Sequence, residues 1–130
     1  MRPQRDRKKA RRFGLRAETI ALFWLVLRGY RVIGRNFLAP GGEIDLIAVR
    51  GSTICFVEVK ARASLDEARI AITSQKRLRI IRAVRVWITR NRWSTGYTLR
   101  GDAIFIAPRR WPRHLTGAFE LELMDAPSNW

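Results

Sequence analysis

The sequence predicts an α/β fold in which one mixed sheet lies between helices, with the elements in the order helix, three strands, helix, strand. Two stretches, 13–28 and 73–91, carry apolar residues at the helical period, whereas the segments between and after them alternate as strands do. No repeat or low-complexity linker divides the 130 residues, which suffice for a domain that buries about two-thirds of its unfolded surface. We therefore expect a single domain over residues 13–130.

The residues before this domain differ from it in composition. Residues 1–12 hold seven Arg and Lys and one acid, Asp6. Because such charge density opposes collapse, we expect them to form a disordered basic arm. The arm either contacts nucleic-acid phosphates or is a solvated tail without a function.

The first predicted helix has one buried face and a defined end. Its apolar residues at the spacing of one helical face are Ala17, Ile20, Ala21 and Trp24, widened by Leu22, Leu25 and Leu27. Gly29 follows as a helix-ending glycine. Glu18 is the only acid in this helix, and it is either an early-turn residue favoured by the helix dipole or part of a site.

Three strands and a second helix follow. Segments 30–37, 43–48 and 55–60 read as strands, with a turn at 39–42, while 63–72 is ambiguous between a helical turn and a loop. The second helix begins at Thr73 or Ser74 and ends near Asn91, with the inner stripe Ile80, Ile81, Val84, Trp87 and Ile88. A further strand over 99–107 carries Asp102, and the apolar and aromatic residues of 111–121 are expected to cover the core.

Asp45, Glu58 and Lys60 lie in two adjacent predicted strands, and we expect them to meet on one face of a β-hairpin. If the turn between the strands has two central residues, Asp45 lies directly opposite Glu58, and Glu43 lies opposite Lys60. Period-two alternation then puts all four on the same face. A four-residue loop keeps this pairing, whereas a loop of odd length breaks it.

Opposed carboxylates among apolar neighbours need a positive charge, because like charges at this separation repel. A hard divalent cation such as Mg²⁺ or Mn²⁺ is the simplest candidate, with Asp45 and Glu58 as ligands and the Val59 carbonyl as a further oxygen. Lys60 reaches the same space. Two acids beside a lysine are typical of phosphodiester hydrolysis, in which the metal activates water and the ammonium group stabilises the developing charge.

The charge balance indicates a nucleic-acid partner. There are 26 Lys and Arg against 11 Asp and Glu, which gives a net charge of +15, and such an excess concentrates polyanions. The second helix carries a row of arginines that suits a phosphate track or a solvated face: Arg77, Arg79, Arg82, Arg85 and Arg90. The alternatives are a merely soluble basic protein and one that binds ribosomal RNA or anionic lipid.

Other features narrow the class of protein. Cys55 is the only cysteine, which excludes an internal disulfide and fits a buried residue in a reducing cytoplasm. His114 is the only histidine, so zinc sites built on His and Cys are excluded. The longest apolar run, 20–27, is too short for a bilayer, which needs about 20 residues. We expect a cytoplasmic protein that does not insert into a membrane.

Residues 41–48 and 56–62 together resemble the YraN-like family of small bacterial proteins. That family belongs to the PD-(D/E)xK nuclease superfamily and is similar to the archaeal Holliday-junction resolvases. The resemblance continues at Gly14–Glu18, at Thr73–Lys76 and at Trp111–His114, and it covers nearly all of the chain after the basic arm. It implies a single restriction-endonuclease-like domain.

The resemblance also implies roles for individual residues. Asp45 and Glu58 match the metal ligands and Lys60 the catalytic lysine. Glu18 matches the helix acid that completes such sites in the resolvase-like branch, so that it would join the ligands and the catalytic set. Lys76 matches a lysine of the second helix that contacts phosphate.

Three arginines are expected to bind nucleic acid beside Lys76: Arg62, directly after the motif, and Arg79 and Arg82 in the second helix. One departure is visible. The family usually reads Arg-Phe-Asp in the late strand, where this chain has Arg100-Gly101-Asp102. The missing aromatic is expected to weaken local packing, and it puts any role of Asp102 in doubt.

The sequence therefore supports a metal-dependent nuclease that acts on DNA, including branched or structured DNA. The alternative is a nucleic-acid-binding module that keeps a nuclease-like fold without cutting, and a structural RNA-associated protein would use only the charge. Resolvases act as dimers because a junction has two-fold symmetry, so a homodimer is a further option.

Overall fold

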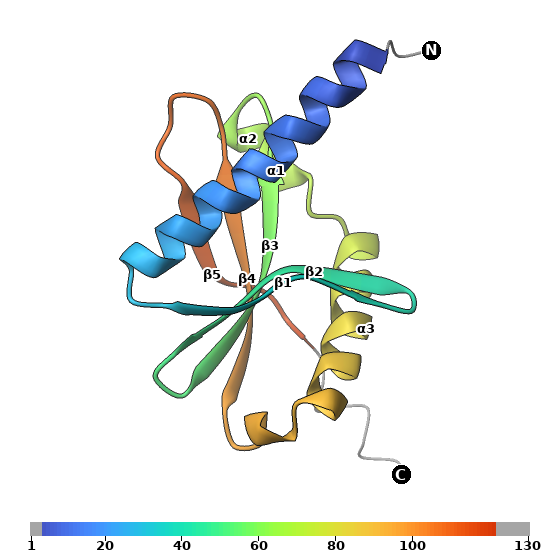
Figure 1. Ribbon diagram of the computed structural model, residues 1–130, viewed down its shortest axis with the longest axis vertical. Helices are drawn as coiled ribbons and strands as arrows, with labels where there is room; N and C mark the ends of the chain where they lie inside the picture. Colours follow the sequence, from blue (N-terminus) through green and yellow to red (C-terminus); the bar gives the residue numbers. More distant parts are fainter. Residues whose placement is uncertain (1–3, 122–130) are drawn as a thin grey trace.

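The computed structural model describes residues 4–121 (Figure 1). Its helices are α1 (Gln4–Leu27), α2 (Leu65–Ile70), α3 (Ser74–Arg90) and the short 3₁₀ helix η1 (Arg92–Ser94). Its strands are β1 (Arg31–Ala39), β2 (Gly42–Arg50), β3 (Thr53–Ala61), β4 (Thr98–Ile106) and β5 (Arg113–Phe119). Residues 1–3 of the expected arm and 122–130 of the expected domain lie outside the described residues.

The five strands form one mixed sheet in the order β1-β2-β3-β4-β5. β3 and β4 run parallel, and every other neighbouring pair is antiparallel. The crossover from β3 to β4 carries α2 and α3, and α1 lies across the opposite face (Figure 1). The predicted α/β class, with a mixed sheet between helices, is confirmed. Among the described helices, none combines the length and the apolar character needed to cross a bilayer.

α1 begins inside the segment for which we expected disorder. Residues 4–12 form its first turns and are continuous with the part that packs on the sheet. They contain neither Gly nor Pro and consist mainly of Arg, Lys, Gln and Ala, all good helix formers. Since the packed turns that follow provide a nucleus, extending the helix toward its N-terminus costs little. Net charge alone therefore does not predict disorder here, because it takes no account of helix propensity.

The end of α1 is as predicted. Gly29 adopts φ = +87°, and its N–H and that of Tyr30 donate to the carbonyls of Val26 and Leu25. This is the glycine-ended helix cap in which two orphan carbonyls are satisfied at once. It turns the chain directly into β1.

The buried face of α1 is narrower than the sequence predicted. Ala17, Ala21 and Leu25 are fully buried against the sheet. Ile20 is 44 % exposed and Leu27 80 % exposed, so these two do not belong to the buried face. The fully buried positions follow one another four residues apart, so the contact with the sheet is a narrow stripe that leaves Ile20 and Leu27 at its side.

α3 covers the other face through the stripe that the sequence predicted. Ile80, Ile81, Val84 and Trp87 are buried, and the indole of Trp87 meets the ring of Phe56 on β3 edge to face, with centroids 5.4 Å apart. α2 settles the ambiguous segment before α3 as a short helix, capped by the hydroxyl of Ser64.

β5 was expected only as apolar cover, and it is instead an edge strand paired with β4. Its Phe119 ring packs directly on Gly101, at a place where any Cβ would collide with it. Phe119 therefore fills the space beside Gly101, and the weakened packing expected there is not seen.

Gly42 fixes the tip of the β1–β2 hairpin against α3. A Cβ at this position would collide with the backbone carbonyl of Arg79, which cannot rotate away. We predict that Gly42→Ala lowers the free energy of unfolding by about 1–3 kcal/mol or more, because overpacking against backbone forces a shift of the helix or the hairpin. Urea denaturation measures this change.

Gly34→Ala is the matched control for this prediction. Its added Cβ would lie 3.2 Å from the terminal methyl of Ile47, a side-chain end that can move. If the two substitutions destabilised the protein equally, the close approach of Gly42 to α3 would not be a constraint on the fold.

Candidate active site where β2 and β3 separate

The hairpin register predicted from the sequence is confirmed. Arg50 pairs with Thr53 across the two-residue turn 51–52, and the pairing continues in the same register to Leu46 and Val57. Gly51 has φ = +59°, the left-handed conformation that favours glycine in such turns.

The ladder of paired residues ends at the step where Asp45 and Glu58 would come next. There the Val59 N–H donates to Oδ2 of Asp45 at 2.8 Å, so a side-chain oxygen accepts this strand's N–H. β2 continues its pairing with β1 as far as Gly42. The two acids thus lie at the point where β2 and β3 separate, and this arrangement relieves the like-charge contact that strict pairing would impose.

Glu58 and Lys60 form a buried ion pair. The Lys60 Nζ lies 2.9 Å from Oε1 of Glu58, and each side chain is 8 % exposed. The pair lies on the face of β3 that also carries Ile54 and Phe56, as period-two alternation predicts. The predicted partnership of Lys60 with Glu43 is not formed, because Glu43 is exposed and Lys60 turns to Glu58 on its own strand.

Asp45 lies in a site that is short of positive charge. Burial, followed by the neighbouring Glu58 carboxylate, raises the pKa of Asp45 from its ordinary 3.8 to about 8, although the Val59 N–H and Lys60 act in the opposite direction. One ammonium group is therefore insufficient for both carboxylates.

Glu18 approaches the same acids from α1. The Glu18 carboxylate contributes to the raised pKa of Asp45. Burial raises the pKa of Glu18 itself, although Arg35 and a hydrogen bond from Asn36 act to lower it. Its Oε1 is buried and has no hydrogen-bond partner among the described residues. The helix-dipole alternative does not account for this position, because Glu18 lies in the middle of the 24-residue α1.

Asn36 is a contributor that sequence reasoning missed. It lies in β1 with φ = +52°, a left-handed conformation that Asn tolerates better than most residues. An Asn in a predicted strand was the available signal. Its neighbour Arg35 donates to Oγ1 of Thr19 at 2.8 Å and so ties β1 to α1 beside Glu18.

Lys76 comes to the site from the first turn of α3. Its N–H donates to Oγ1 of Thr73, which caps the helix, and its amine lies near that of Lys60. This contact lowers the pKa of Lys76. The pKa of Lys60 is raised because the contacts with Lys76 and Glu58 outweigh the effect of burial. Lys60 is accordingly the member of the pair that holds the proton more tightly.

The three expected nucleic-acid arginines lie in two places. Arg62 is exposed at the end of β3 and is near enough to help lower the pKa of Lys76. Arg79 and Arg82 instead line a separate groove between α3 and the tip of the β1–β2 hairpin. The structure thus gathers Asp45, Glu58, Lys60, Glu18 and Lys76, with Arg62 at the margin, and sets Arg79 and Arg82 apart.

The oxygen atoms at this site suit a hard divalent cation. Asp45 and Glu58 supply carboxylates at the separating strands, and Glu18 supplies a buried oxygen without a partner. Within residues 4–121 no three acidic, His or Cys side chains already converge as a ligand set, because the ammonium of Lys60 is the group that contacts Glu58. A cation at this site would also relieve the charge deficit around Asp45.

Asp102 belongs to a different cluster on the α1 face of the sheet. Its buried carboxylate accepts hydrogen bonds from Arg100, from the Gly117 N–H and from the His114 ring at 2.8–3.0 Å. Although burial raises its pKa, these partners together lower it to about 2. The same guanidinium reaches the hydroxyl of Tyr30. Asp102 therefore joins β4, β5 and the start of β1, and it is not part of the carboxylate site.

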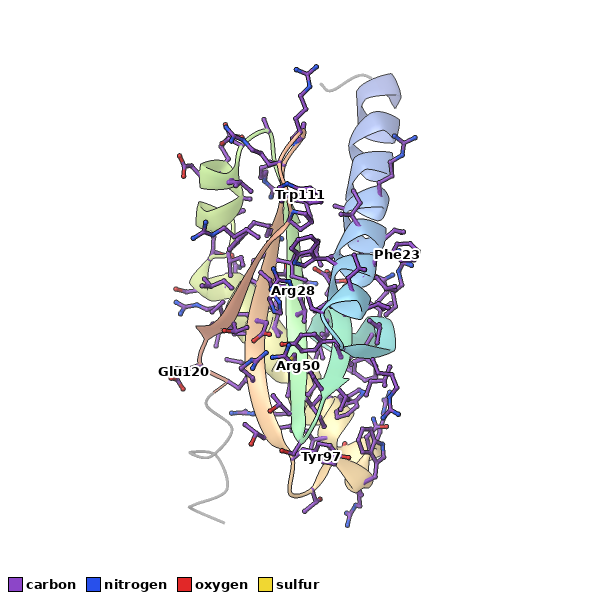
Figure 2. The ribbon with its side chains drawn as sticks, turned by 90° about the vertical axis from the view of Figure 1, so that its left-hand side faces the viewer. Phe23, Arg28, Arg50, Tyr97, Trp111 and Glu120 are labelled. Carbon is purple, nitrogen blue, oxygen red and sulfur yellow. The ribbon has the colours of Figure 1, made fainter. Side chains whose placement is uncertain are left out.

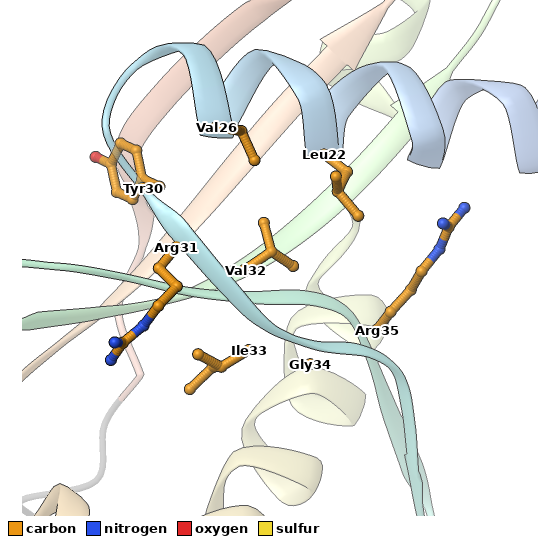
Figure 3. A pocket seen from close by; sticks show the side chains of 8 residues that line it. All are labelled: Leu22, Val26, Tyr30, Arg31, Val32, Ile33, Gly34 and Arg35. Carbon is orange, nitrogen blue, oxygen red and sulfur yellow. The ribbon is translucent and has the colours of Figure 1, made fainter.

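An apolar groove between α1 and β1 adjoins both clusters, because Tyr30 and Arg35 are among the residues that line it. Figure 3 shows Leu22 and Val26 of α1 facing Val32 of β1, whereas Ile33 points to the other side of the strand; Arg31 and Arg35 also line the groove. No acid lines this groove, so it offers no metal ligands.

Comparison with known proteins finds one family and several relatives that carry its name. Residues 17–106 match the uncharacterised protein family UPF0102. A UPF0102 protein of Methylorubrum extorquens is 57 % identical over 126 residues, which is 94 % of this chain and 98 % of the relative. The UPF0102 protein of Methylobacterium nodulans is 60 % identical over 106 residues, which is 82 % of each chain. That of Methylocella silvestris is 50 % identical over 122 residues, which is 94 % of this chain and 98 % of the relative.

We predict that the stability of the metal-free protein falls as pH rises from about 4 to about 8. The unfolded chain releases the Asp45 proton near 3.8 and the folded protein only near 8, so a rise in pH between these values favours unfolding. Asp45→Asn should remove most of this dependence. Each pKa unit by which the folded and unfolded states differ corresponds to about 1.4 kcal/mol of stability. Urea denaturation in EDTA at pH 5 and at pH 8.5 therefore resolves the difference in the free energy of unfolding.

Asp66→Asn, at an exposed acid of α2, is the control for this experiment. It should keep the wild-type slope of stability against pH. An Asp45→Asn protein with that same slope would contradict the charge deficit described above.

Asp102→Asn should destabilise the fold by about 3–5 kcal/mol, because it removes the buried carboxylate that pairs with Arg100 and His114. The carboxylate's contribution is fully present above pH 3.8 and is lost as pH falls toward 2, since its folded pKa lies below the unfolded one. Urea denaturation at pH 7 and in acid tests both statements. A variant as stable as the wild type would show that the cluster does not hold β5.

Proposed function

The chain belongs to the UPF0102 family, and we propose that it is a metal-dependent nuclease that hydrolyses phosphodiester bonds in DNA. The observation that carries the proposal is that the part-buried Asp45 and the buried Glu58 lie beside Lys60, which is ion-paired with Glu58, with too little positive charge for both carboxylates. Buried carboxylates with a strongly shifted pKa are costly to the fold, and such costs are typical of functional sites.

Asp45 and Glu58 would hold Mg²⁺ or Mn²⁺, with the carbonyl of Val59 as a further ligand. When bound, the cation would supply Lewis acidity at the phosphoryl group and a water of lowered pKa. Glu18, with its unpartnered oxygen, would hold a second ion or orient the attacking water.

Lys60 would act on the phosphate itself. Its pKa is raised, so it is an ammonium group at neutral pH, and it is already held in place by Glu58. A fixed positive charge beside the phosphate stabilises the extra negative charge of the pentacovalent transition state. Lys76, near Lys60 at the start of α3, would contact a phosphate next to the scissile one.

DNA is the proposed substrate, because the +15 net charge favours a polyanion and the site suits phosphodiester chemistry. Arg62 lies at the margin of the site, and Arg79 and Arg82 lie on the groove along α3, where they would hold the backbone farther from the cut. We propose branched or otherwise structured DNA in the cytoplasm as the target.

Two copies acting together would suit a branched substrate with two-fold symmetry. The support for a homodimer is the exposed apolar side of α1, where Phe23 is 61 % exposed and points away from the sheet (Figure 2). Light scattering of the purified protein gives the mass of the assembly.

A binding module is the second candidate, and one observation favours it. The 2.9 Å contact between Lys60 and Glu58 already neutralises one of the two carboxylates without a metal. Such a module would bind DNA in a strongly salt-dependent manner and would not turn over with any metal ion.

We predict that Glu58→Gln and Asp45→Asn lower metal-dependent cleavage by more than about 100-fold, because each removes a direct ligand where even the loss of an outer partner costs 10–100-fold. Lys60→Gln should lower the rate by about 10²–10³-fold. Cleavage of linear, flapped and four-way DNA with Mg²⁺ or Mn²⁺ measures the rates, and fluorescence anisotropy measures DNA binding, which should be retained.

Asp66→Asn is again the matched control and should cleave like the wild type. Calorimetric titration of Mn²⁺ separates the two candidates: binding that Asp45→Asn abolishes supports the nuclease. Cleavage that survives both the Asp45 and the Glu58 substitutions would refute the assignment, and a wild type that binds DNA but neither Mn²⁺ nor Mg²⁺ would favour the module.

A further inference from the structure

The loop between β4 and β5, residues 107–112, leaves the sheet at the end where the carboxylate site lies. β3 and β4 run parallel with Lys60 beside Phe105, and the Arg62 N–H donates to the carbonyl of Ile106 at 3.1 Å. The loop therefore starts level with Arg62, two residues beyond Lys60. Trp111 on this loop was expected to cover the core, and its exposure shows that this prediction is wrong for it.

Trp111 stands on this loop as an open aromatic surface. Its side chain is 81 % exposed, and it faces α1, where its ring lies 5.9 Å from that of Trp24 at a tilt of 36° (Figure 2). The Trp24 Nε1 has no hydrogen-bond partner among the described residues, so no hydrogen bond to it locks the pair in place. A large apolar ring in this setting has one face available to a further planar group.

The surroundings of Trp111 are cationic. Arg28, Arg110 and Arg113 line the same hollow, and no acid lines it. The Arg28 guanidinium lies over the Trp24 ring, 4.8 Å from its centroid, so a positive charge is fixed directly beside the ring pair. Aromatic faces interleaved with arginines are the arrangement that binds nucleobases together with their phosphates.

This surface is close to the carboxylate site along α1. Glu18 belongs to that site and Trp24 to the ring pair, and the step of six positions from one to the other corresponds to about 9 Å of helix rise.

We propose that Trp111, with Arg28, Arg110 and Arg113, forms a stacking site for an unpaired base of a DNA strand whose phosphate lies at the carboxylate site. The inference rests on the proposed function and narrows its substrate: continuous duplex offers no free base face to an indole, whereas a flap or a junction does. The arginines hold the phosphates that flank the unpaired base.

The test compares Trp111→Ala with the wild type on two DNAs, a blunt duplex and the same duplex with a short unpaired flap, in EDTA so that neither is cut. We expect about 5- to 100-fold weaker binding of the flapped DNA by fluorescence anisotropy, with little change for the blunt duplex, because stacking on one aromatic ring contributes this much. A 2-aminopurine at the unpaired position should be quenched by the wild type and not by Trp111→Ala, and Trp111→Phe should restore most of both effects.

Trp93→Ala is the matched control, because Trp93 is a second exposed tryptophan, 49 % accessible, that packs with Trp87 and Tyr97 away from this loop. It should leave both affinities unchanged. An equal loss on both DNAs, no loss on either, or conversion of a dimer to a monomer by Trp111→Ala would overturn the stacking site and leave the nuclease proposal intact. A wild type that binds neither DNA would refute the proposed function itself.

Discussion

The separation of β2 and β3 in front of Asp45 and Glu58 is the constraint on which the rest of the site depends. Strict pairing would press two carboxylates together between buried side chains, and the free energy of that contact is unfavourable. Instead, the carboxylate of Asp45 accepts the Val59 N–H, and Lys60 turns onto Glu58. The Val59 N–H keeps a hydrogen-bond partner, and Glu18 on α1 lies near enough to add to the repulsion around Asp45.

The two buried acidic clusters show opposite solutions to the same problem. Asp102 is surrounded by donors, so its pKa falls to about 2 and the cluster holds strands together. Asp45 has too few donors, so its pKa rises to about 8. A carboxylate that has all its hydrogen-bond donors stabilises the fold, whereas one with too few donors can be stabilised by a bound cation. This contrast supports a role in binding for the Asp45 site and a role in stability for Asp102.

Much of the fold was predictable because its signals are local. The turn 51–52 set the register of the hairpin, and the apolar stripe of α3 was readable at the helical period. β5 was not predictable, because its pattern is inverted: His114 faces inward to reach Asp102, while Leu115 is 42 % exposed. A strand that buries a polar residue and exposes an apolar one cannot be recognised by alternation. The first turns of α1 were missed because net charge was weighed without helix propensity.

The sequence by itself determined the hairpin register, because a turn of even length and period-two alternation bring Asp45 and Glu58 to the same step along the two strands. Only the tertiary structure decided that the strands part at that step and that Glu18 and Lys76 reach the acids from helices on opposite faces of the sheet. The physical reason is that charge repulsion and burial act between segments far apart in the chain. Local sequence patterns do not show which residues far apart in the chain will be buried next to one another.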